Sequence, residues 1–235
     1  MKLSPVQIQN RRRFIQLAYK AGVSHLGSSL SVIDIIEAVY QVKNQDEKFV
    51  LSNGHAAGAL YVILERHGLL KKADLLALEA HPKREPKIGI DVSTGSLGQG
   101  LSIAVGLALA QRDKKVYCSI SDGECAEGSV SEALRISVEN QLTNLRIIMN
   151  ANSFAAYRPI ELGYLKQMIE GLGWKVKEVN GHDLQQLKDT LRQGDKGMEL
   201  IMALTKVDQL PFLEGINAHY CKMDKHDYYL ARKVW

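Results

Sequence analysis

The chain has 235 residues, of which 46% are hydrophobic and 24% charged, a composition typical of soluble globular proteins. This length can bury a substantial core, and no apolar run reaches the roughly 20 residues that a membrane-spanning helix needs. The first residues, MKLSPVQIQNRRRF, lack the apolar stretch of a secretory signal, so we expect a cytoplasmic protein without membrane contact. The three cysteines lack metal-ligand spacing, which favours free thiols in a reducing compartment.

The net charge is +4, and the basic residues are scattered along the chain. One tight cluster, Arg11-Arg12-Arg13, lies in a segment whose apolar residues have helical spacing. Aromatic and basic residues do not alternate there, as they do in many nucleic-acid-binding segments. We therefore interpret the cluster as a solvated helix face or a subunit contact, and expect no nucleic-acid partner.

The first third of the chain is predicted to be mainly helical, because apolar residues recur at intervals of three and four. The expected elements are helices over 5–21 and 31–42, with Ser31 as N-cap, a strand over 48–51 and a helix over 56–67. A loop-rich stretch, HPKREPKIGIDVSTGSLGQG, follows over 81–100. The next segment, 101–111, is apolar on nearly every side, which predicts a buried helix.

From Lys115 onward, strand-like and helix-like segments alternate strictly. The predicted strands cover 116–120, 145–149, 174–179 and 199–204, and the predicted helices cover 129–141, 161–171 and 184–192. This alternation is typical of right-handed crossovers between parallel strands. We therefore predict an α/β fold, a mostly parallel sheet with helices on both faces. No repeat or linker interrupts the chain, so residues 1–235 are expected to form a single domain.

Two polar clusters follow neighbouring strands of this predicted sheet. Asp122 and Gly123 follow the strand over 116–120, and Asn150 and Asn152 follow the next, so that Asn152 comes thirty residues after Asp122. In a parallel sheet these strand ends share one edge, where ligands bind. The helix expected to begin near Ser129 would point its positive end toward that edge. Carboxylate and amide oxygens suit a hard cation such as Mg²⁺ with a diphosphate, and a helix N-terminus suits the phosphate.

Three histidines lie beside turn residues in the loops of the first third. They occur in the runs Ser24-His25-Leu26-Gly27, Asn53-Gly54-His55 and His81-Pro82. A single loop histidine is usually a surface residue. Three of them, together with the glycine-rich loop STGSLGQG and the SDG turn, indicate one active site.

In this order, the motifs SHLG, FVLSNGHA, HP, STGSLGQGLS, SDGECAEGSVSEA and NAN resemble the diphosphate-binding domain of transketolase. They run from His25 to Asn152, and a general similarity continues to about Thr205. The resemblance implies a Rossmann-like domain that binds thiamine diphosphate with Mg²⁺ or Ca²⁺. It also implies transfer of a two-carbon ketol unit between sugars or sugar phosphates.

The resemblance assigns the metal and the diphosphate to particular residues. Asp122 and the side chain of Asn152 match metal ligands, and the backbone carbonyl of Phe154 matches a third. Gly123 matches the glycine of the metal turn, and His55 matches a histidine that lies against the diphosphate.

Other residues are assigned to the sugar and to the remainder of the cofactor. His25 and His81 match catalytic histidines that hydrogen-bond the sugar and move protons. The loop of Gly95, Ser96 and Leu97 matches the segment whose backbone contacts the aminopyrimidine ring.

Two more residues are assigned to the surroundings of the cofactor. Glu127 matches a glutamate at the subunit interface near the cofactor, and His219 loosely matches a cofactor-binding histidine late in the domain.

The sequence departs from the family pattern at several points. Ser121 stands where the metal turn has a glycine, and Ala151 stands where the Asn-rich turn has an acidic residue. The glycine-rich segment expected near 206–212 reads KVDQLPF, so the sequence leaves open whether residues 206–235 close over the cofactor.

The pyrimidine-binding domain, which carries the cofactor-activating glutamate in the family, has no counterpart in these 235 residues. We therefore expect the N-terminal subunit of a split transketolase that works with a separately encoded C-terminal subunit, in an α2β2 assembly. Two alternatives stay open: the α-subunit of another thiamine-dependent enzyme with 2-oxoacid or acyloin chemistry, and a non-catalytic cofactor-binding homologue.

Overall fold

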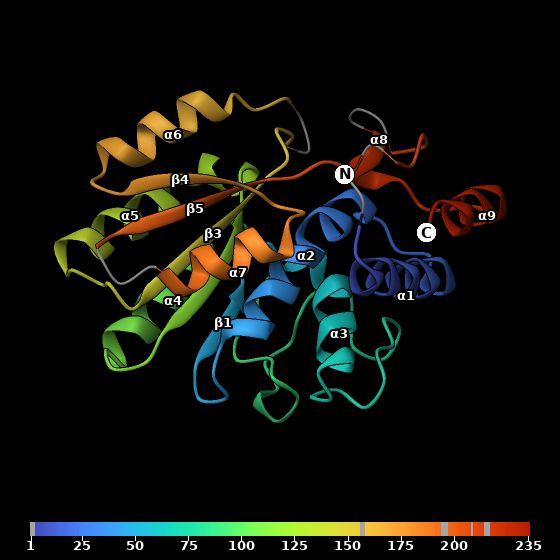
Figure 1. Cartoon of the computed structure of the whole chain (residues 1–235), viewed down its shortest axis with the longest axis horizontal. Coiled ribbons are helices and arrows are strands. Elements are labelled where there is room, and N and C mark those ends of the chain that lie inside the picture. The colour runs from blue at the N-terminus through green and yellow to red at the C-terminus, as the bar shows by residue number, and fades with distance from the viewer. Residues whose placement is uncertain (1–2, 156–157, 194–196, 208, 214–216) are drawn as a thin grey trace.

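The computed structural model describes residues 3–155, 158–193, 197–207, 209–213 and 217–235. Within these residues one parallel sheet has the strand order β1-β2-β3-β5-β4 (Figure 1). The strands are β1 (Lys48–Leu51), β2 (Val116–Ser121), β3 (Leu145–Ala151), β4 (Lys175–Asn180) and β5 (Glu199–Leu204). The predicted α/β fold with a parallel sheet is confirmed.

Helices cover both faces of this sheet, and further helices extend it to one side (Figure 1). Helices α4 (Gln99–Ala110), α5 (Gly128–Glu139) and α6 (Leu162–Gly171) pack on one face. Helices α2 (Leu26–Val42) and α7 (Leu184–Gln193) pack on the other. Beyond α2 lie α1 (Pro5–Ala21), α3 (Ala57–Arg66) and α9 (Lys225–Val234), and the short α8 (Asn217–Tyr220) follows β5.

The alternation of side chains along the strands divides the apolar interior into two cores. In β3, Leu145, Ile147 and Met149 face the α4–α5–α6 core, whereas Ile148 faces the α2–α7 core. Successive strand residues point to opposite faces, so a strand covered on both sides is apolar along its length. All seven residues of β3 are buried, as expected for the middle strand.

Three helices differ from the sequence-based expectation. Helix α2 begins at Leu26 rather than near Ser31, and Ser31 donates its hydroxyl to the Ser28 carbonyl inside the helix instead of capping it. Helix α4 is not buried on all sides, because Ile103 and Leu109 are 39% and 38% exposed. The C-terminal helix α9 was not predicted, although Asp224 caps it in a capping box.

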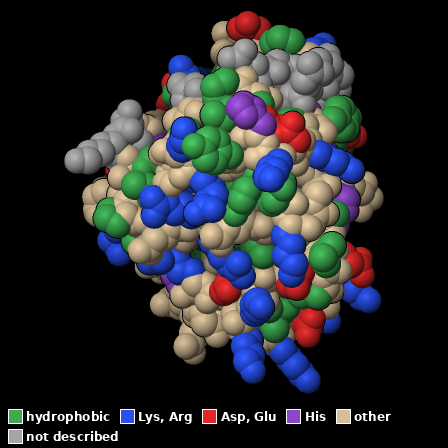
Figure 2. Space-filling view, turned by 90° about the vertical axis from the view of Figure 1, so that its right-hand side faces the viewer, with side chains coloured by type: hydrophobic (Ala, Val, Ile, Leu, Met, Phe, Trp, Pro, Cys, Tyr) green, Lys and Arg blue, Asp and Glu red, His purple; other side chains and the backbone are tan. Residues whose placement is uncertain are grey.

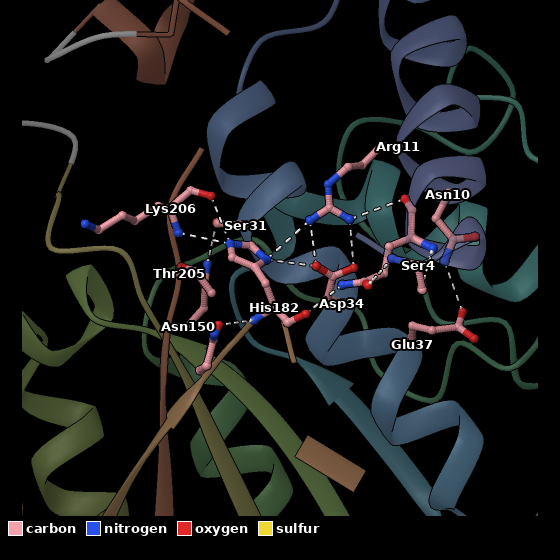
Figure 3. A network of polar contacts seen from close by, with 12 residues as sticks. Ser4, Asn10, Arg11, Ser31, Asp34, Glu37, Asn150, His182, Thr205 and Lys206 are labelled. Carbon is pink, nitrogen blue, oxygen red and sulfur yellow. Dashed lines mark hydrogen bonds and ion pairs between the residues drawn. The ribbon is translucent and has the colours of Figure 1, made fainter. Parts of the chain in front are cut away.

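The arginine cluster is only partly solvated. Arg11 is buried and makes two hydrogen bonds to Asp34 of α2, at 2.8 and 2.6 Å (Figure 3). His182, just after β4, places Nδ1 2.8 Å from the same carboxylate, and its Nε2 accepts the backbone N–H of Lys206 at 3.0 Å. Burial alone would raise the pKa of Asp34, but hydrogen bonds from Arg11 and His182 hold it below its ordinary value. This network ties α1 and α2 to the ends of β4 and β5.

Charged side chains also cover the outside of the helical part. Figure 2 shows Lys and Arg spread over the face formed by the helices at the right of Figure 1, with Asp and Glu among them. On this side Arg13 pairs with Glu65 at 2.8 Å, and Arg12 is exposed. Among the described helices, none combines the length and the apolarity that crossing a bilayer demands.

We expect Arg11→Met to lower the free energy of unfolding by about 3–5 kcal/mol, because it leaves the buried Asp34 carboxylate short of its strongest partner. Urea-induced unfolding of purified variants measures this difference. Arg12→Ala, one position along the same helix but exposed, should change stability by no more than about 0.5 kcal/mol. Equal effects of the two variants would contradict a stabilising role for the buried pair.

Candidate active site

A cavity of about 270 Å³ opens at the carboxyl edge of the sheet, where β1, β2 and β3 end. One wall comes from the turns that follow β2 and β3, and it includes Asp122 and Asn152. The cavity is also lined by His25, His55 and His81, with His219 from α8, and these four residues are called the histidine wall below. The predicted metal turn and the predicted histidines therefore share one cavity.

The turns after β2 and β3 are held together through Asp122. Its side chain is 2% exposed; Oδ1 accepts the Gly123 N–H at 2.9 Å, and Oδ2 accepts the Ser153 N–H at 2.7 Å. Asn152 Oδ1 accepts the N–H of Phe154 at 3.0 Å. Each of these oxygens keeps a lone pair that can point into the cavity. The turn is strained at Ser153, which has φ 66°.

Burial raises the pKa of Asp122 to about 6, and the N–H groups of Ser153 and Gly123 offset part of that increase. Near neutral pH the group is a buried carboxylate with no cationic side chain among its hydrogen-bond partners in the described chain. Such a charge is costly to bury, and a divalent cation would neutralise it.

Three of these histidines, His25, His55 and His219, form a cluster of rings. The His25 ring lies 5.0 Å from that of His55 and 4.6 Å from that of His219, measured between ring centroids. Burial, together with a smaller contribution from the neighbouring histidines, lowers the pKa of His25 to about 4 and that of His55 to about 3. Burial also lowers the pKa of His219. At neutral pH, neutral rings can both donate and accept hydrogen bonds.

His25 is held by its backbone as well as by its neighbours. It lies at the N-cap of α2 in the left-handed conformation, with φ 61°, and its N–H donates to the His219 carbonyl at 3.1 Å. This hydrogen bond brings the segment after β5 back to the cavity, so the loosely matched His219 does lie at the site. Of the segment 206–212, Asp208 lies outside the described residues.

Several polar atoms at the cavity have no hydrogen-bond partner within the described chain. A polar ligand in the cavity could pair with them. Asn53 borders the cavity fully buried, and neither its Oδ1 nor its Nδ2 is hydrogen-bonded; His25 Nδ1 is also buried and unpaired. Leaving such a group unsatisfied costs about 1–3 kcal/mol. These polar atoms, together with the Asp122 and Asn152 oxygens, fit a diphosphate with a divalent cation.

Glycines let the loops around the cavity approach closely. A Cβ on Gly54 would lie 2.7 Å from the Thr94 carbonyl carbon, and one on Gly100 would lie 2.5 Å from Ser52 Cα. Gly95 packs against the His81 ring, with φ 153°. The turn after β1 and the glycine-rich loop therefore pack backbone against backbone.

Two predicted residues lie outside the cavity. Ser96 and Glu127 are exposed and do not line it, although Gly95 and Leu97 do. Conversely, Asn53 and Tyr220 line the cavity and were not singled out from sequence. The SNGH run contains Asn53 directly before Gly54-His55, and this position could have indicated it.

Comparison with known proteins gives the same family as the motifs. Residues 8–207 match the family described as transketolase, thiamine diphosphate binding domain. The chain is 33% identical to one subunit of the apulose-4-phosphate transketolase of Phocaeicola vulgatus, covering 92% of this chain and 88% of that protein. It is 30% identical to the 6-deoxy-6-sulfo-D-fructose transketolase subunit SqwG of a Clostridium species, covering 92% and 87%.

A solved structure agrees. Transketolase from Campylobacter jejuni superposes with a TM-score of 0.83 at 27% identity, covering 97% of this chain but only 42% of that one. The cofactor of such a domain is thiamine diphosphate with a divalent cation, and the polar lining of the cavity fits both. The chain belongs to the transketolase family and forms its thiamine diphosphate-binding domain.

Proposed function

We propose that this chain is the N-terminal subunit of a split transketolase that transfers a two-carbon ketol unit between sugars or sugar phosphates. The observation that carries the proposal is that the predicted metal turn and four histidines line one cavity. Similarity to named transketolase subunits also supports the proposal, because the chain covers 88% of the Phocaeicola vulgatus subunit and 87% of the Clostridium subunit SqwG.

In this proposal the turns after β2 and β3 hold the cation. Asp122 supplies the charged oxygen, and Asn152 and the carbonyl of Phe154 supply neutral ones, a ligand set that suits Mg²⁺ or Ca²⁺. Gly123 would keep the turn tight, and His55, which lines the same cavity, would hydrogen-bond the diphosphate. Thiamine diphosphate, when bound, supplies the carbon nucleophile and the electron sink that ketol transfer requires.

The histidines that line the cavity would orient the sugar and move its protons. His25 and His81 lie beside His55, and a neutral imidazole can take a proton from a sugar hydroxyl at one nitrogen. The low pKa values of His25 and His55 keep their rings neutral across physiological pH. The donor and acceptor sugars would be selected partly by the partner chain.

An exposed apolar surface supports assembly with other chains. Ile103 and Leu109 of α4 are exposed, and Leu97, at the rim of the cavity, is 39% exposed. Exposed apolar patches next to a binding site commonly mark protein interfaces. We propose that this surface and Glu127 meet other subunits, with two copies of this chain in the core of an α2β2 assembly.

We expect Asp122→Ala to weaken magnesium-dependent binding of thiamine diphosphate by more than about 100-fold in the assembled enzyme, since the variant lacks the charged ligand. Isothermal titration calorimetry measures this. Asp113→Ala is the control, because Asp113 is exposed and lies before β2, at the opposite edge of the sheet. Wild-type affinity of Asp122→Ala would refute the metal assignment.

The same site should lose Mg²⁺ as the pH falls through about 6. The raised pKa of Asp122 means that protons compete with the cation below that pH, so affinity should drop about tenfold per pH unit there. Above pH 7 the affinity should be nearly constant. A titration that is flat between pH 7 and pH 5 would contradict this role of the Asp122 carboxyl.

For the histidines we expect His81→Ala and His25→Asn to reduce sugar turnover by about 100-fold or more with smaller effects on cofactor affinity. Asn is chosen at position 25 because it tolerates the left-handed backbone there. His55→Ala should instead mainly weaken cofactor binding. Steady-state kinetics and calorimetry separate the two effects, and His226→Ala, on the exposed side of α9, is the control. Normal turnover in all three variants would make these ordinary loop histidines.

The isolated chain should be inactive and bind thiamine diphosphate weakly, because the activating carboxylate of the family lies in a domain that these residues do not include. Adding the separately encoded pyrimidine-domain subunit should restore ketol transfer. Native mass spectrometry of the mixture should show two copies of each chain. Robust cleavage of a ketose phosphate by this chain alone would overturn the split-enzyme proposal.

A further inference from the structure

We propose that Glu124 is a positioning residue that clamps three cofactor-binding segments together. The proposal rests on the proposed function, because those segments are the ones assigned to the cofactor and the cation. Glu124 belongs to the short 3-10 turn Gly123–Ala126, directly after Asp122, and its side chain is fully buried. It does not line the cavity, so it touches neither cofactor nor substrate there.

The two carboxylate oxygens accept hydrogen bonds from three segments: the turn after β1, the glycine-rich loop and the end of β2. Oε1 accepts the Ser52 hydroxyl at 2.6 Å and the Gly98 N–H at 2.9 Å. Oε2 accepts the Ser121 N–H at 2.9 Å and lies 3.4 Å from the Ser121 hydroxyl. In sequence, Ser52 and Gly98 are 46 residues apart and Ser121 lies 23 residues further on. Backbone pairing of β1 with β2 already joins the segments of Ser52 and Ser121, and the Glu124 side chain adds the glycine-rich loop to them.

Each partner of Glu124 lines the cavity or is the direct neighbour of a residue that does. Ser52 precedes Asn53, and Gly98 follows Leu97. Ser121 lines the cavity itself and precedes Asp122. Movement of any of the three partners would displace a cavity-lining residue. Glu124 and these three partners, called the clamp below, therefore set the distance between the metal turn, the turn of Asn53 and His55, and the glycine-rich loop.

The chemistry of these contacts requires a carboxylate. Both oxygens accept a backbone N–H, and glutamine has only one acceptor oxygen. Whichever way the amide of Glu124→Gln is turned, its NH₂ group would face the N–H of Gly98 or that of Ser121. A buried N–H would then lose its partner, and one loop would move away. The side chain thus has to be an acceptor on both sides, which no neutral residue of its size provides.

A second buried carboxylate in the same chain offers a matched control. Glu37 of α2 is 1% exposed and accepts the Gln41 amide at 2.6 Å and the Asn10 amide at 3.2 Å. It lies in the helical part of the chain and does not line the cavity. Glu37→Gln makes the same chemical change in a similarly buried place, and it also removes the charge that faces Arg66 and His67 at 3.4 Å, so it controls for general loss of stability.

The test compares Glu124→Gln with Glu37→Gln by amide hydrogen exchange of the full chain and by calorimetric titration of the assembled enzyme with Mg²⁺ and thiamine diphosphate. We expect Glu124→Gln to speed exchange at Gly98 or Ser121 by about tenfold, and to leave β3 protected. We expect it to weaken cofactor affinity about tenfold, and Glu37→Gln to change both quantities by less than about twofold.

Ser52→Ala keeps the carboxylate and removes one contact, so it tests the clamp if Glu124→Gln does not fold. It should weaken cofactor affinity about threefold alone, and by much less when added to Glu124→Gln, because the two residues act as one unit. Unchanged exchange and affinity in both Glu124→Gln and Ser52→Ala would overturn the proposal. So would equal losses in Glu124→Gln and Glu37→Gln.

Failure of the Glu124 proposal can be distinguished from failure of the proposed function. If the wild-type assembly does not bind thiamine diphosphate with Mg²⁺, the proposed function fails, and the exchange comparison still decides whether Glu124 holds the three loops. If the wild type binds and the Glu124 variants match it, only the clamp is refuted.

Discussion

All five strands run in the same direction, and this constraint determines where the chemistry can be placed. The carboxyl ends of β1, β2 and β3 are adjacent, so the turns that follow them meet at one edge of the sheet. Asn53, Asp122 and Asn152 each follow one of these strands, and all three border the same cavity. Residues far apart in the sequence thus become neighbours through strand order alone, before any specific side-chain contact is considered.

Strand order brings the turns close, and buried polar contacts then determine their exact positions. Asn150, the residue before Ala151 at the end of β3, donates to the Ser31 hydroxyl at 2.8 Å and accepts from the Thr205 hydroxyl at 2.8 Å (Figure 3). Apolar packing is non-directional, whereas these hydrogen bonds specify how α2 is rotated against the sheet. Because His25 lies at the start of α2, the same contacts orient the histidine wall toward the metal turn.

The sequence predicts the sheet well because its signals are local. Alternation of strands and helices, together with the rule for strand ends, placed Asp122 and Asn152 at one edge. The predicted start of α2 was wrong, because the run Gly27-Ser28-Ser29 looks like a loop and only tertiary packing makes it helical. The burial of Arg11 could not be predicted either, since its partner Asp34 lies in another helix and nothing in the sequence marks an ion pair. Burial of Asn53 likewise depends on loops distant in sequence.

The turns that line the cavity follow strands at different positions in the sheet. Asp122 follows β2, and Asn152 follows β3, which lies at the centre of the sheet and is buried along its whole length. His55 instead follows β1, a strand of four residues at the edge of the sheet. The hydrogen bonds of edge strands break in local fluctuations of low free energy, whereas those of central strands often break only on global unfolding. During local opening of the sheet, the turn that carries His55 should therefore separate first, while the turns after β2 and β3 stay together.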